Sequence, residues 1–522
     1  MIIISSGAYV IGEFQVELGK IPPCFLPLGN KKLLEHQVEI LKDKFPNETI
    51  LVSLPESYIL SKSEQGLITQ LGIINIPIPD DFSLAESISY VINVTNYLPE
   101  DHVIRIMYGD TLIHDLPETS EIQDVLGVAY SQDSYSWKIE QNSETPLIWC
   151  GFFSFNTKLL LMRCLALNRH DFIAAVERYR QEKNLKLYIF NNWFDLGHVN
   201  TYFRSRARIT TQRAFNEIRI ESGVLHKTGL PAKKIQAEGL WFKNIPSFLR
   251  IFTPQLINQY LDQQQLAHYE LEYLPHMPLN ELFVHGQNTD VEWKGLFGLV
   301  RGFLNKTDIE LNAFEQEKIQ NDFQKLVGEK TYLRLHQFAD VNNINLQQAM
   351  LYQENVLPSL LDICQECIEL VVNLPDYPGI LHGDLCFSNI LYDSRAFQIK
   401  VIDPRGLNIA GEFTIYGDRK YDLAKLTHSV VGLYDHIIAG RYVLNEDVDT
   451  GAMDLHFDID DRIVVIQERF LKFEFIQGLT VQQILPLVIL LFLSMLPLHS
   501  DRVDRQKAML ANALRLYVLF KS

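Results

Sequence analysis

Short apolar runs alternate with amphipathic stretches through the first part of the chain, up to about residue 205. The runs expected to be strands are 1–5, 48–55, 73–79 and 102–110, and the stretches with apolar residues at helical spacing are 31–45 and 83–98. Strands that alternate with helices predict a mostly parallel sheet with both faces covered. Sites in such sheets lie at the carboxyl ends of strands, and Asp110 stands at one of these ends.

The pattern changes near residues 205–215, where the sequence becomes basic and polar and a domain boundary is expected. The runs that follow are two short strands at 216–222 and 223–229, a helix at 233–245 and a strand at 267–274. From about Glu292 onward the chain has mostly helical periodicity, except in the segment 380–401. The second part of the chain is therefore expected to be a small β-rich lobe followed by a larger helical lobe.

The segment LHGDLCFSNILYDSRAFQIKVIDPRG contains Asp384, Asn389 five residues later, and Asp403 at the end of a strand-like run. Phosphoryl transfer needs a carboxylate to accept the proton of the attacking hydroxyl, and two oxygen ligands from different segments to hold Mg²⁺. The D-x4-N…D spacing is that of kinase catalytic loops. Hairpin turns also use Asp and Asn to satisfy backbone groups, but they rarely combine all three positions, so the pattern favours a phosphoryl-transfer site.

The same two motifs, HGDLCFSN and VIDPRG, resemble the aminoglycoside phosphotransferase and choline kinase family, which are small-molecule kinases with a protein-kinase-like bilobal fold. The resemblance covers roughly residues 213–520. It implies that Asp384 is the catalytic base, that Asn389 and Asp403 bind Mg²⁺, and that His382 braces the loop. ATP would be the phosphoryl donor.

The resemblance also implies a nucleotide site in the small lobe. Lys227 in GVLHKTG is the best candidate for the lysine that contacts phosphates, and Glu238 for the helical glutamate that holds it. The segment YELEYLPHMPLNELF resembles the hinge that meets adenine. Arg405 stands where protein kinases have Phe-Gly, and it could either add positive charge near phosphate or substrate, or pair with Asp418 or Asp422.

The acceptor pocket is the least defined part of this expectation. Lys330, Arg334 and His336 could face an acidic acceptor or form a solvated helix face. His499 and Asp501 could line the acceptor pocket, although a histidine at a helix end is more often structural.

The N-terminal part resembles the sugar nucleotidyltransferase family in four segments that occur in the family's order: PPCFLPLGNKKLLEHQVEIL, MYGDTL, IWCGFFSF and NNWFDLGHVNTYFRSRA. The resemblance implies a Rossmann-like fold in which Asp110 and Asp195 bind Mg²⁺. This chemistry needs the metal to neutralise a triphosphate while a sugar phosphate attacks its α-phosphorus.

The nucleotide loop of that family, G-x-G-T-R, is incomplete in this chain. Gly7 remains, the second glycine and the arginine are absent, and Cys24 replaces the lysine after the proline-rich turn. Lys20 or Lys138 could substitute for the missing charge. The domain is therefore either a divergent transferase that uses a second nucleoside triphosphate, such as CTP or UTP, or a fold retained to bind a nucleotide sugar or a partner enzyme.

These resemblances predict a nucleotidyltransferase-like α/β domain at 1–206, a kinase-like N-lobe at 207–280 and a helical C-lobe with the catalytic loop at 281–522. We therefore expect a bifunctional enzyme that phosphorylates a hydroxyl on a sugar or small polar alcohol and then couples the phosphate to a nucleotide. Such chemistry serves capsule and other surface-polysaccharide assembly. The alternatives are a kinase with a non-catalytic N-terminal domain and, less in keeping with the complete motif, a scaffold without activity.

Charge and composition limit the partners. The net charge of −17 argues against non-specific binding to nucleic acid or anionic membrane. Six scattered cysteines are typical of a reducing cytoplasm, and Cys364 and Cys367 have the spacing of helix residues. The apolar run 484–498 is shorter than a membrane span and contains two prolines, and residues 1–12 lack the features of a signal peptide. We therefore expect a cytoplasmic protein without a membrane span, whose oligomeric state stays open.

Overall fold

The computed structural model describes residues 1–95, 103–118, 123–133, 135–141, 144–210, 218–447 and 449–522. The chain divides into two compact units, which are Met1–Thr210 with His285–Gln287, and Thr211–Val284 with Asn288–Ser522. We call them unit 1 and unit 2. The expected boundary region 205–215 lies partly in residues 211–217, outside the described residues, so the boundaries after residues 206 and 280 remain predictions.

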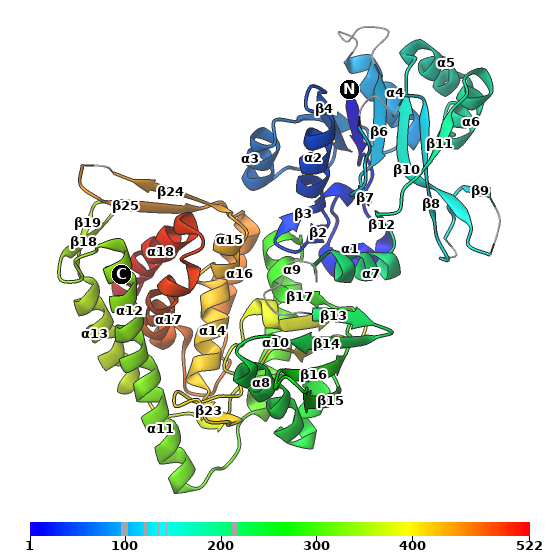
Figure 1. Ribbon diagram of the computed structural model, residues 1–522. Coiled ribbons are helices and arrows are strands. Elements are labelled where there is room, and N and C mark those ends of the chain that lie inside the picture. The colour runs from blue at the N-terminus through cyan, green and yellow to red at the C-terminus, as the bar shows by residue number, and fades with distance from the viewer. Residues whose placement is uncertain (96–102, 119–122, 134, 142–143, 211–217, 448) are drawn as a thin grey trace. The chain divides into compact units, whose positions relative to one another are not determined.

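Unit 1 is built around an eight-stranded sheet in the order β11-β8-β10-β6-β1-β4-β5, with β9 paired to β10 (Figure 1). The strands are β1 (Ile2–Ser5), β4 (Ile50–Pro55), β5 (Ile74–Ile78), β6 (Ile104–Tyr108), β8 (Val125–Tyr130), β9 (Ile139–Gln141), β10 (Leu147–Phe155) and β11 (Lys186–Ile189). β1, β4, β5 and β6 run parallel, whereas β10 is antiparallel to β6 and β8. Because β8 and β9 are antiparallel to β10 and β11 is parallel to β8, every strand of this sheet except β10 runs in one direction, and the expectation of a mostly parallel sheet is confirmed with β10 as the exception. No helix separates β8 from β10 in the described residues, and parallel pairing needs such a crossover.

Successive side chains along the strands of unit 1 point to opposite faces of the sheet, and each face packs in its own hydrophobic core. Ile3 packs in a core that α4, α5 and α6 close, and Ile4 packs in a core that α2 and α3 close. The helices of unit 1 are α1 (Gly12–Leu18), α2 (Leu33–Lys44), α3 (Lys62–Gln70), α4 (Leu84–Val94), α5 (Lys158–Asn168), α6 (Phe172–Glu182) and α7 (Val199–Thr210). The predicted helices correspond to α2 and α4, and positions 96–98 and 102 of the predicted elements lie outside the described residues.

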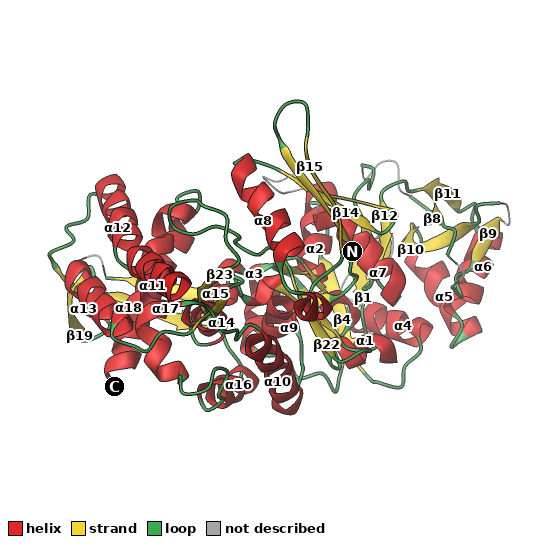
Figure 2. Cartoon of the chain, turned by 90° about the horizontal axis from the view of Figure 1, so that it is seen from below, coloured by secondary structure: helices red, strands yellow, loops and turns green. Residues whose placement is uncertain are grey.

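Unit 2 begins with a four-stranded antiparallel sheet in the order β13-β14-β16-β15, and helix α8 packs on it (Figure 2). These elements are β13 (Ile218–Glu221), β14 (Val224–Thr228), α8 (Ala232–Asn244), β15 (Leu256–Leu261) and β16 (Ala267–Glu272). The sequence predicts four of them but not β15. No residue of β15 is fully buried, so its sequence has no apolar face to mark it as a strand.

Most of the remaining chain is helical, as expected. The principal helices are α9 (Leu279–His285), α10 (Asp290–Lys306), α11 (Ala313–Val327), α12 (Glu329–Asn342), α13 (Leu360–Val372), α14 (Lys420–Val430), α16 (Asp461–Leu471), α17 (Val481–Met495) and α18 (Val503–Lys521). The stretch Val481–His499 is apolar and long enough to cross a membrane, yet 72% of its most apolar window is buried among the other helices. Cys364 and Cys367 are free, buried residues of α13.

The sequence did not predict a second sheet inside the helical part. It contains β18 (Ala349–Tyr352), β19 (Asn355–Ser359), β24 (Tyr442–Glu446) and β25 (Met453–Phe457), in the order β19-β18-β25-β24. Its two hairpins lie about ninety residues apart and meet through one parallel pairing, Tyr352 with Met453. Each strand is short and half-exposed, so periodicity alone gives no signal for it.

We expect the Trp293→Ala substitution to destabilise unit 2 by about 3–5 kcal/mol, because it leaves a large cavity. The Trp293 ring is fully buried, and it packs against Phe283 and stacks on Phe387 of the catalytic loop at 5.4 Å. Urea unfolding measures the loss. Val291→Ala on the same helix is the control, since Val291 is 69% exposed, and an equal loss in both variants would contradict the expectation.

Candidate functional site

The catalytic-loop motif connects β20 (Pro378–Ile380) to the hairpin of β21 (Ile390–Asp393) and β22 (Gln398–Val401). A short 3-10 turn, Phe387–Asn389, brings Asn389 back toward Asp384. The Asn389 amide nitrogen donates to the backbone oxygen of Asp384 at 2.8 Å and to its carboxylate at 3.2 Å. The two residues that the sequence places five positions apart are therefore in direct contact.

Buried groups hold this loop from behind. The backbone N–H groups of His382 and Gly383 both donate to the Asp422 carboxylate, at 2.9 and 2.8 Å. The His382 ring accepts from the backbone N–H of Asp384 at 3.3 Å, and burial lowers the pKa of this histidine to about 4, so the ring is neutral. Trp241 of α8 donates to the oxygen of Leu381. These bonds agree with the bracing function expected of His382.

Lys425 of α14 lies against the Asp384 side chain, with 2.9 Å between its ammonium and the carboxylate. Burial of Asp384 opposes its ionisation, but the charge of Lys425 outweighs this effect and keeps the pKa of Asp384 below its ordinary value. The sequence reasoning did not identify Lys425. Nothing in its local sequence separates it from an ordinary amphipathic-helix lysine, so only the folded chain reveals the pair.

Lys227, Glu238 and Asp403 meet in one ion cluster, in which Lys227 and Glu238 are buried and Asp403 is partly exposed. The Lys227 ammonium is 2.8 Å from the Glu238 carboxylate and 3.0 Å from the Asp403 carboxylate. The hydroxyl of Tyr269, on β16, donates to Glu238 at 2.9 Å. Burial disfavours the charged lysine, yet its two carboxylate partners raise the pKa of Lys227 above the ordinary value. Residues from β14, α8 and the end of β22 are thereby brought together.

The backbone around Asp403 is unusual. Asp403 has a φ of +56°, a left-handed conformation that is uncommon for a residue other than glycine and that often occurs at functional sites. Gly406 follows with a φ of +63°, and a Cβ there would lie 2.3 Å from the carbonyl oxygen of Ala237 in α8. The segment after Asp403 is therefore packed against α8 without room for a side chain.

Asn389 and Asp403 fit the chemistry of an Mg²⁺ site, because each has a side-chain oxygen that the bonds described above leave available. Asn389 uses its amide nitrogen toward Asp384, and its Oδ1 accepts only a long bond of 3.5 Å from the Ser388 hydroxyl among the bonds of the described residues, so it retains a lone pair for a cation. Asp403 binds Lys227 through Oδ1, and its side chain is 41% exposed. Mg²⁺ prefers such oxygen ligands and completes its coordination with phosphate and water.

Arg405 does not form either of the ion pairs that the sequence left open. Asp418 pairs with Lys420 at 3.1 Å, and Asp422 receives the two backbone N–H groups of the catalytic loop. The Arg405 guanidinium instead lies 5.8 Å from the ring centre of Tyr421. Of the expected acceptor residues, His499 is half-buried near Tyr434, and Asp501 and His336 are exposed.

Asp110 and Asp195 lie together in unit 1, at the edge where β7 (Thr111–Ile113) pairs with β12 (Trp193–Asp195). The backbone N–H of Leu196 donates to the oxygen of Asp110, and a Cβ on Gly197 would be 2.2 Å from the Asp110 carboxylate. Burial and the charge of Asp195 raise the pKa of Asp110 to about 6. A divalent cation between the two carboxylates would relieve this repulsion, so the pair fits a metal.

Aromatic rings surround this carboxylate pair, a feature the sequence did not indicate. The His198 ring is 2.8 Å from the Asp195 carboxylate and stacks on Tyr135 with 3.8 Å between ring centres. Trp137 contacts His198 edge-on and also meets Trp193. The hydrogen bond to Asp195 raises the pKa of His198.

The residues expected to replace the missing nucleotide-loop charges are occupied elsewhere. Lys20 lies over the Tyr9 ring at 4.0 Å, and Lys138 pairs with Glu177 at 3.3 Å. Cys24 is fully buried, and burial raises the pKa of its thiol to about 12. Helix α1 occupies part of the stretch that corresponds to the family's nucleotide loop.

Comparisons with known proteins give matches at the level of solved structures. No family model and no curated protein sequence matches the chain. The N-terminal part is similar to the nucleoside-diphosphate-sugar pyrophosphorylase from Vibrio cholerae RC9, with 17% identity over 40% of this chain and 99% of that chain and a TM-score of 0.31.

The C-terminal part is similar to a thermostable mutant of the aminoglycoside phosphotransferase APH(4)-Ia, with 10% identity over 58% of this chain and 89% of that chain and a TM-score of 0.36. It is also similar to a choline/ethanolamine kinase family protein from Mesorhizobium loti, with 10% identity over 62% and 96% of the two chains and a TM-score of 0.32. Both likenesses expected from the motifs are thus found. The activities proposed below rest on the geometry of the two sites.

We expect Gly383→Ala to destabilise the protein more than Gly440→Ala. Both glycines have a positive φ, +80° and +72°, which costs an L-residue about 1–2 kcal/mol. A Cβ on Gly383 would also lie 2.7 Å from the Cβ of Arg405, whereas a Cβ on Gly440 meets nothing within 4 Å. Urea unfolding of the two variants isolates the contact with Arg405, and equal losses would show that the catalytic loop and Arg405 can move apart freely.

Proposed function

We propose that unit 2 is an ATP-dependent kinase that phosphorylates a hydroxyl on a sugar or small polar alcohol. The observation that carries this proposal is the assembly of Lys227, Glu238 and Asp403 in one ion cluster, on a bilobal α+β scaffold whose catalytic loop pairs Asp384 with Asn389. A turn that uses Asp and Asn only to satisfy backbone groups does not require a buried lysine between two carboxylates. Burial of such charges costs free energy, so the arrangement points to a function.

Each side chain has a distinct function in this proposal. Asp384 accepts the proton of the attacking hydroxyl, and the nearby Lys425 keeps it ionised and therefore free to accept that proton. Lys227, held by Glu238, binds the phosphates of ATP. Asn389 and Asp403 hold Mg²⁺, which neutralises phosphate charge when it is bound. The neutral His382 fixes the loop and takes no proton.

We further propose that unit 1 transfers a nucleotide to the phosphorylated product. The adjacent carboxylates of Asp110 and Asp195 support this function, since their repulsion favours a divalent cation between them. A phosphate made by unit 2 would be the substrate of unit 1, and a shared chain raises the local concentration of that intermediate. The complete reaction would supply an activated precursor for surface polysaccharide in the cytoplasm.

A second candidate function is a kinase whose unit 1 binds a nucleotide sugar or a partner enzyme without catalysis. The incomplete nucleotide loop and the buried, neutral Cys24 favour this alternative. CTP, UTP or another nucleoside triphosphate would be bound by unit 1 only if it is a transferase.

We expect Asp384→Asn to reduce ATP-dependent phosphorylation by about 10²–10⁴-fold, since removal of a general base has this effect. ADP formation is measured with a panel of free sugars, amino alcohols and sugar acids. Asp340→Asn, an exposed position of α12, is the control. Unchanged turnover in the Asp384 variant would disprove its assignment as the base.

For unit 1 we expect Asp110→Asn to abolish pyrophosphate release from a nucleoside triphosphate and a sugar phosphate. The measurement uses each of the four triphosphates, and Asp43→Asn, whose side chain is 74% exposed, serves as the control. Absence of pyrophosphate release in the unmodified protein with every triphosphate would favour the binding-module alternative.

A further inference from the structure

Three cationic side chains gather beside the catalytic loop of unit 2, and we call Lys330, Arg334 and Arg405 the cation cluster. Lys330 and Arg334 belong to α12, one turn apart, and Arg405 follows Asp403. Arg405 is fixed to the catalytic loop, because its backbone N–H donates to the oxygen of His382 at 2.8 Å and its side chain packs against Gly383.

The members of the cluster are close enough to repel one another. Burial, and then the charges of Arg405, Arg334 and Lys425, lower the pKa of Lys330 to about 7. Burial also lowers the pKa of Arg334, and Arg405 adds to this effect. Tyr421 interacts with both arginines, since its ring is 5.8 Å from Arg405 and its hydroxyl favours the charge of Arg334.

No carboxylate of the described residues forms an ion pair with any member of the cluster. Arg334 is positioned instead by a hydrogen bond to the backbone oxygen of Ser494 at 3.2 Å. Asp384, the proposed catalytic base, already has Lys425 as its partner. Partly buried cations without a counter-charge destabilise the folded chain, so such a cluster indicates a place where a bound anion supplies the missing charge.

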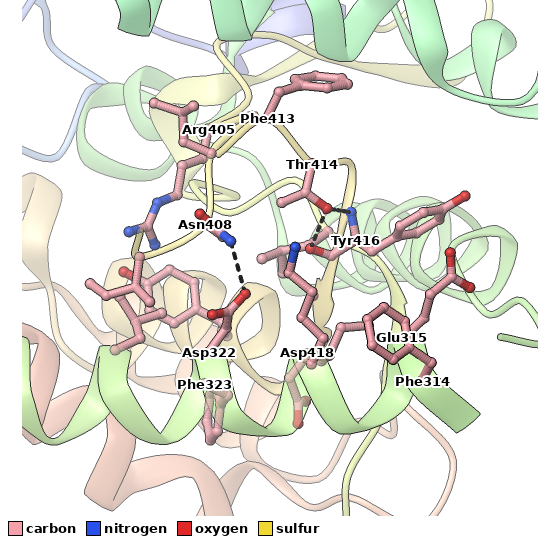
Figure 3. A pocket seen from close by; sticks show the side chains of 18 of the residues that line it. Phe314, Glu315, Asp322, Phe323, Arg405, Asn408, Phe413, Thr414, Tyr416 and Asp418 are labelled. Carbon is pink, nitrogen blue, oxygen red and sulfur yellow. Dashed lines mark hydrogen bonds between the residues drawn. The ribbon is translucent and has the colours of Figure 1, made fainter. Parts of the chain in front are cut away.

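Arg405 is the member of the cluster that lines a cavity of about 290 Å³, and Lys330 and Arg334 do not line it. Its wall also includes Tyr421, Leu326 and the carboxylates of Glu315, Asp322 and Asp418, of which Asp322 accepts from Asn408 and Asp418 pairs with Lys420. Figure 3 shows the Arg405 side chain directed toward α11, whose Asp322 and Phe323 lie across the cavity. The space is large enough for part of a small molecule, and it adjoins the loop that carries Asp384.

We propose that the cation cluster binds an anionic group of the acceptor, a carboxylate or a phosphate, while the acceptor's hydroxyl lies at Asp384. The acceptor would then be a sugar acid or a phosphorylated sugar or alcohol, not a neutral or cationic one. This inference rests on the kinase function proposed above for unit 2. The ATP phosphates have a separate cationic partner in Lys227, which leaves the cluster for the acceptor.

Sulfate binding tests the anion site without any knowledge of the acceptor. Isothermal titration with sodium sulfate, at constant ionic strength set with chloride, compares the unmodified protein with Lys330→Gln, Arg405→Gln and the double variant Lys330→Gln/Arg334→Gln. We expect each single variant to weaken sulfate binding about tenfold and the double variant to weaken it further. Lys325→Gln, on the exposed face of α11, should bind as the unmodified protein does.

Absence of sulfate binding in the unmodified protein, or equal binding in the cluster variants, would overturn the anion site. Because two single variants remove charges from different segments, a folding defect in one of them does not decide the result. Circular dichroism establishes that each variant is folded before titration. The sulfate titration tests the anion site whether or not unit 2 is a kinase.

Acceptor assays then distinguish a carboxylate from a phosphate as the recognised anion, and they test the anion site separately from the kinase function. Hexoses are compared with the matching uronic acids and hexose phosphates, and we expect a KM at least about tenfold lower for the acids or the phosphates than for the neutral parents. Lys330→Gln should raise the KM of the anionic acceptor and leave that of a neutral one unchanged.

Equal use of neutral acceptors would overturn the inference and leave the kinase function intact. A fall in kcat with unchanged acceptor KM would instead assign the cluster to the transferring phosphoryl group. Absence of Asp384-dependent ATP consumption with every acceptor would refute the kinase function itself.

Discussion

The ion cluster of Lys227, Glu238 and Asp403 is the constraint on which the rest of unit 2 depends. A lysine that is 4% exposed must have its charge compensated, and both compensating carboxylates come from other elements. The strand β14, the helix α8 and the segment after β22 can therefore pack in one arrangement only. That arrangement leaves the second oxygen of Asp403 and the amide oxygen of Asn389 for a cation, so a requirement of folding also positions the proposed metal ligands.

The sequence predicts those residues whose spacing along the chain is fixed by the requirements of phosphoryl transfer. Spacing alone predicts Asp384, Asn389 and Asp403, and a resemblance implies Lys227 and Glu238. The structure brings these residues into two contacting groups. The residues that support them were not predictable in the same way. Lys425 and the Arg334 side chain owe their positions to how helices pack, and neither has a local sequence signal that distinguishes it from a solvated helix residue. The sheet of β18, β19, β24 and β25 was missed for a similar reason, because its two hairpins are far apart in the chain.

Unit 1 combines a pair of adjacent carboxylates, which we propose to hold a metal, with a loop that lacks the second glycine and the arginine of the G-x-G-T-R pattern. The parallel strands of its sheet and the pairing of β7 with β12 place Asp110 beside Asp195. By contrast, Cys24 is buried, Lys138 pairs with Glu177, and the exposed Lys20 lies over the ring of Tyr9. The aromatic rings around His198 enclose the carboxylate pair with apolar surface, which strengthens the electrostatic attraction of any cation held there.

The close packing of Gly406 against Ala237 affects how unit 2 could be controlled. Many protein kinases are switched off by swinging the helix that carries the glutamate away from the lysine. In this chain the corresponding helix, α8, touches the segment after Asp403 so closely that a methyl group would not fit. An outward swing of α8 would have to separate this contact and strand Lys227 without Glu238. Movement of α8 would therefore change the packing around Gly406 and the pairing of Lys227 together.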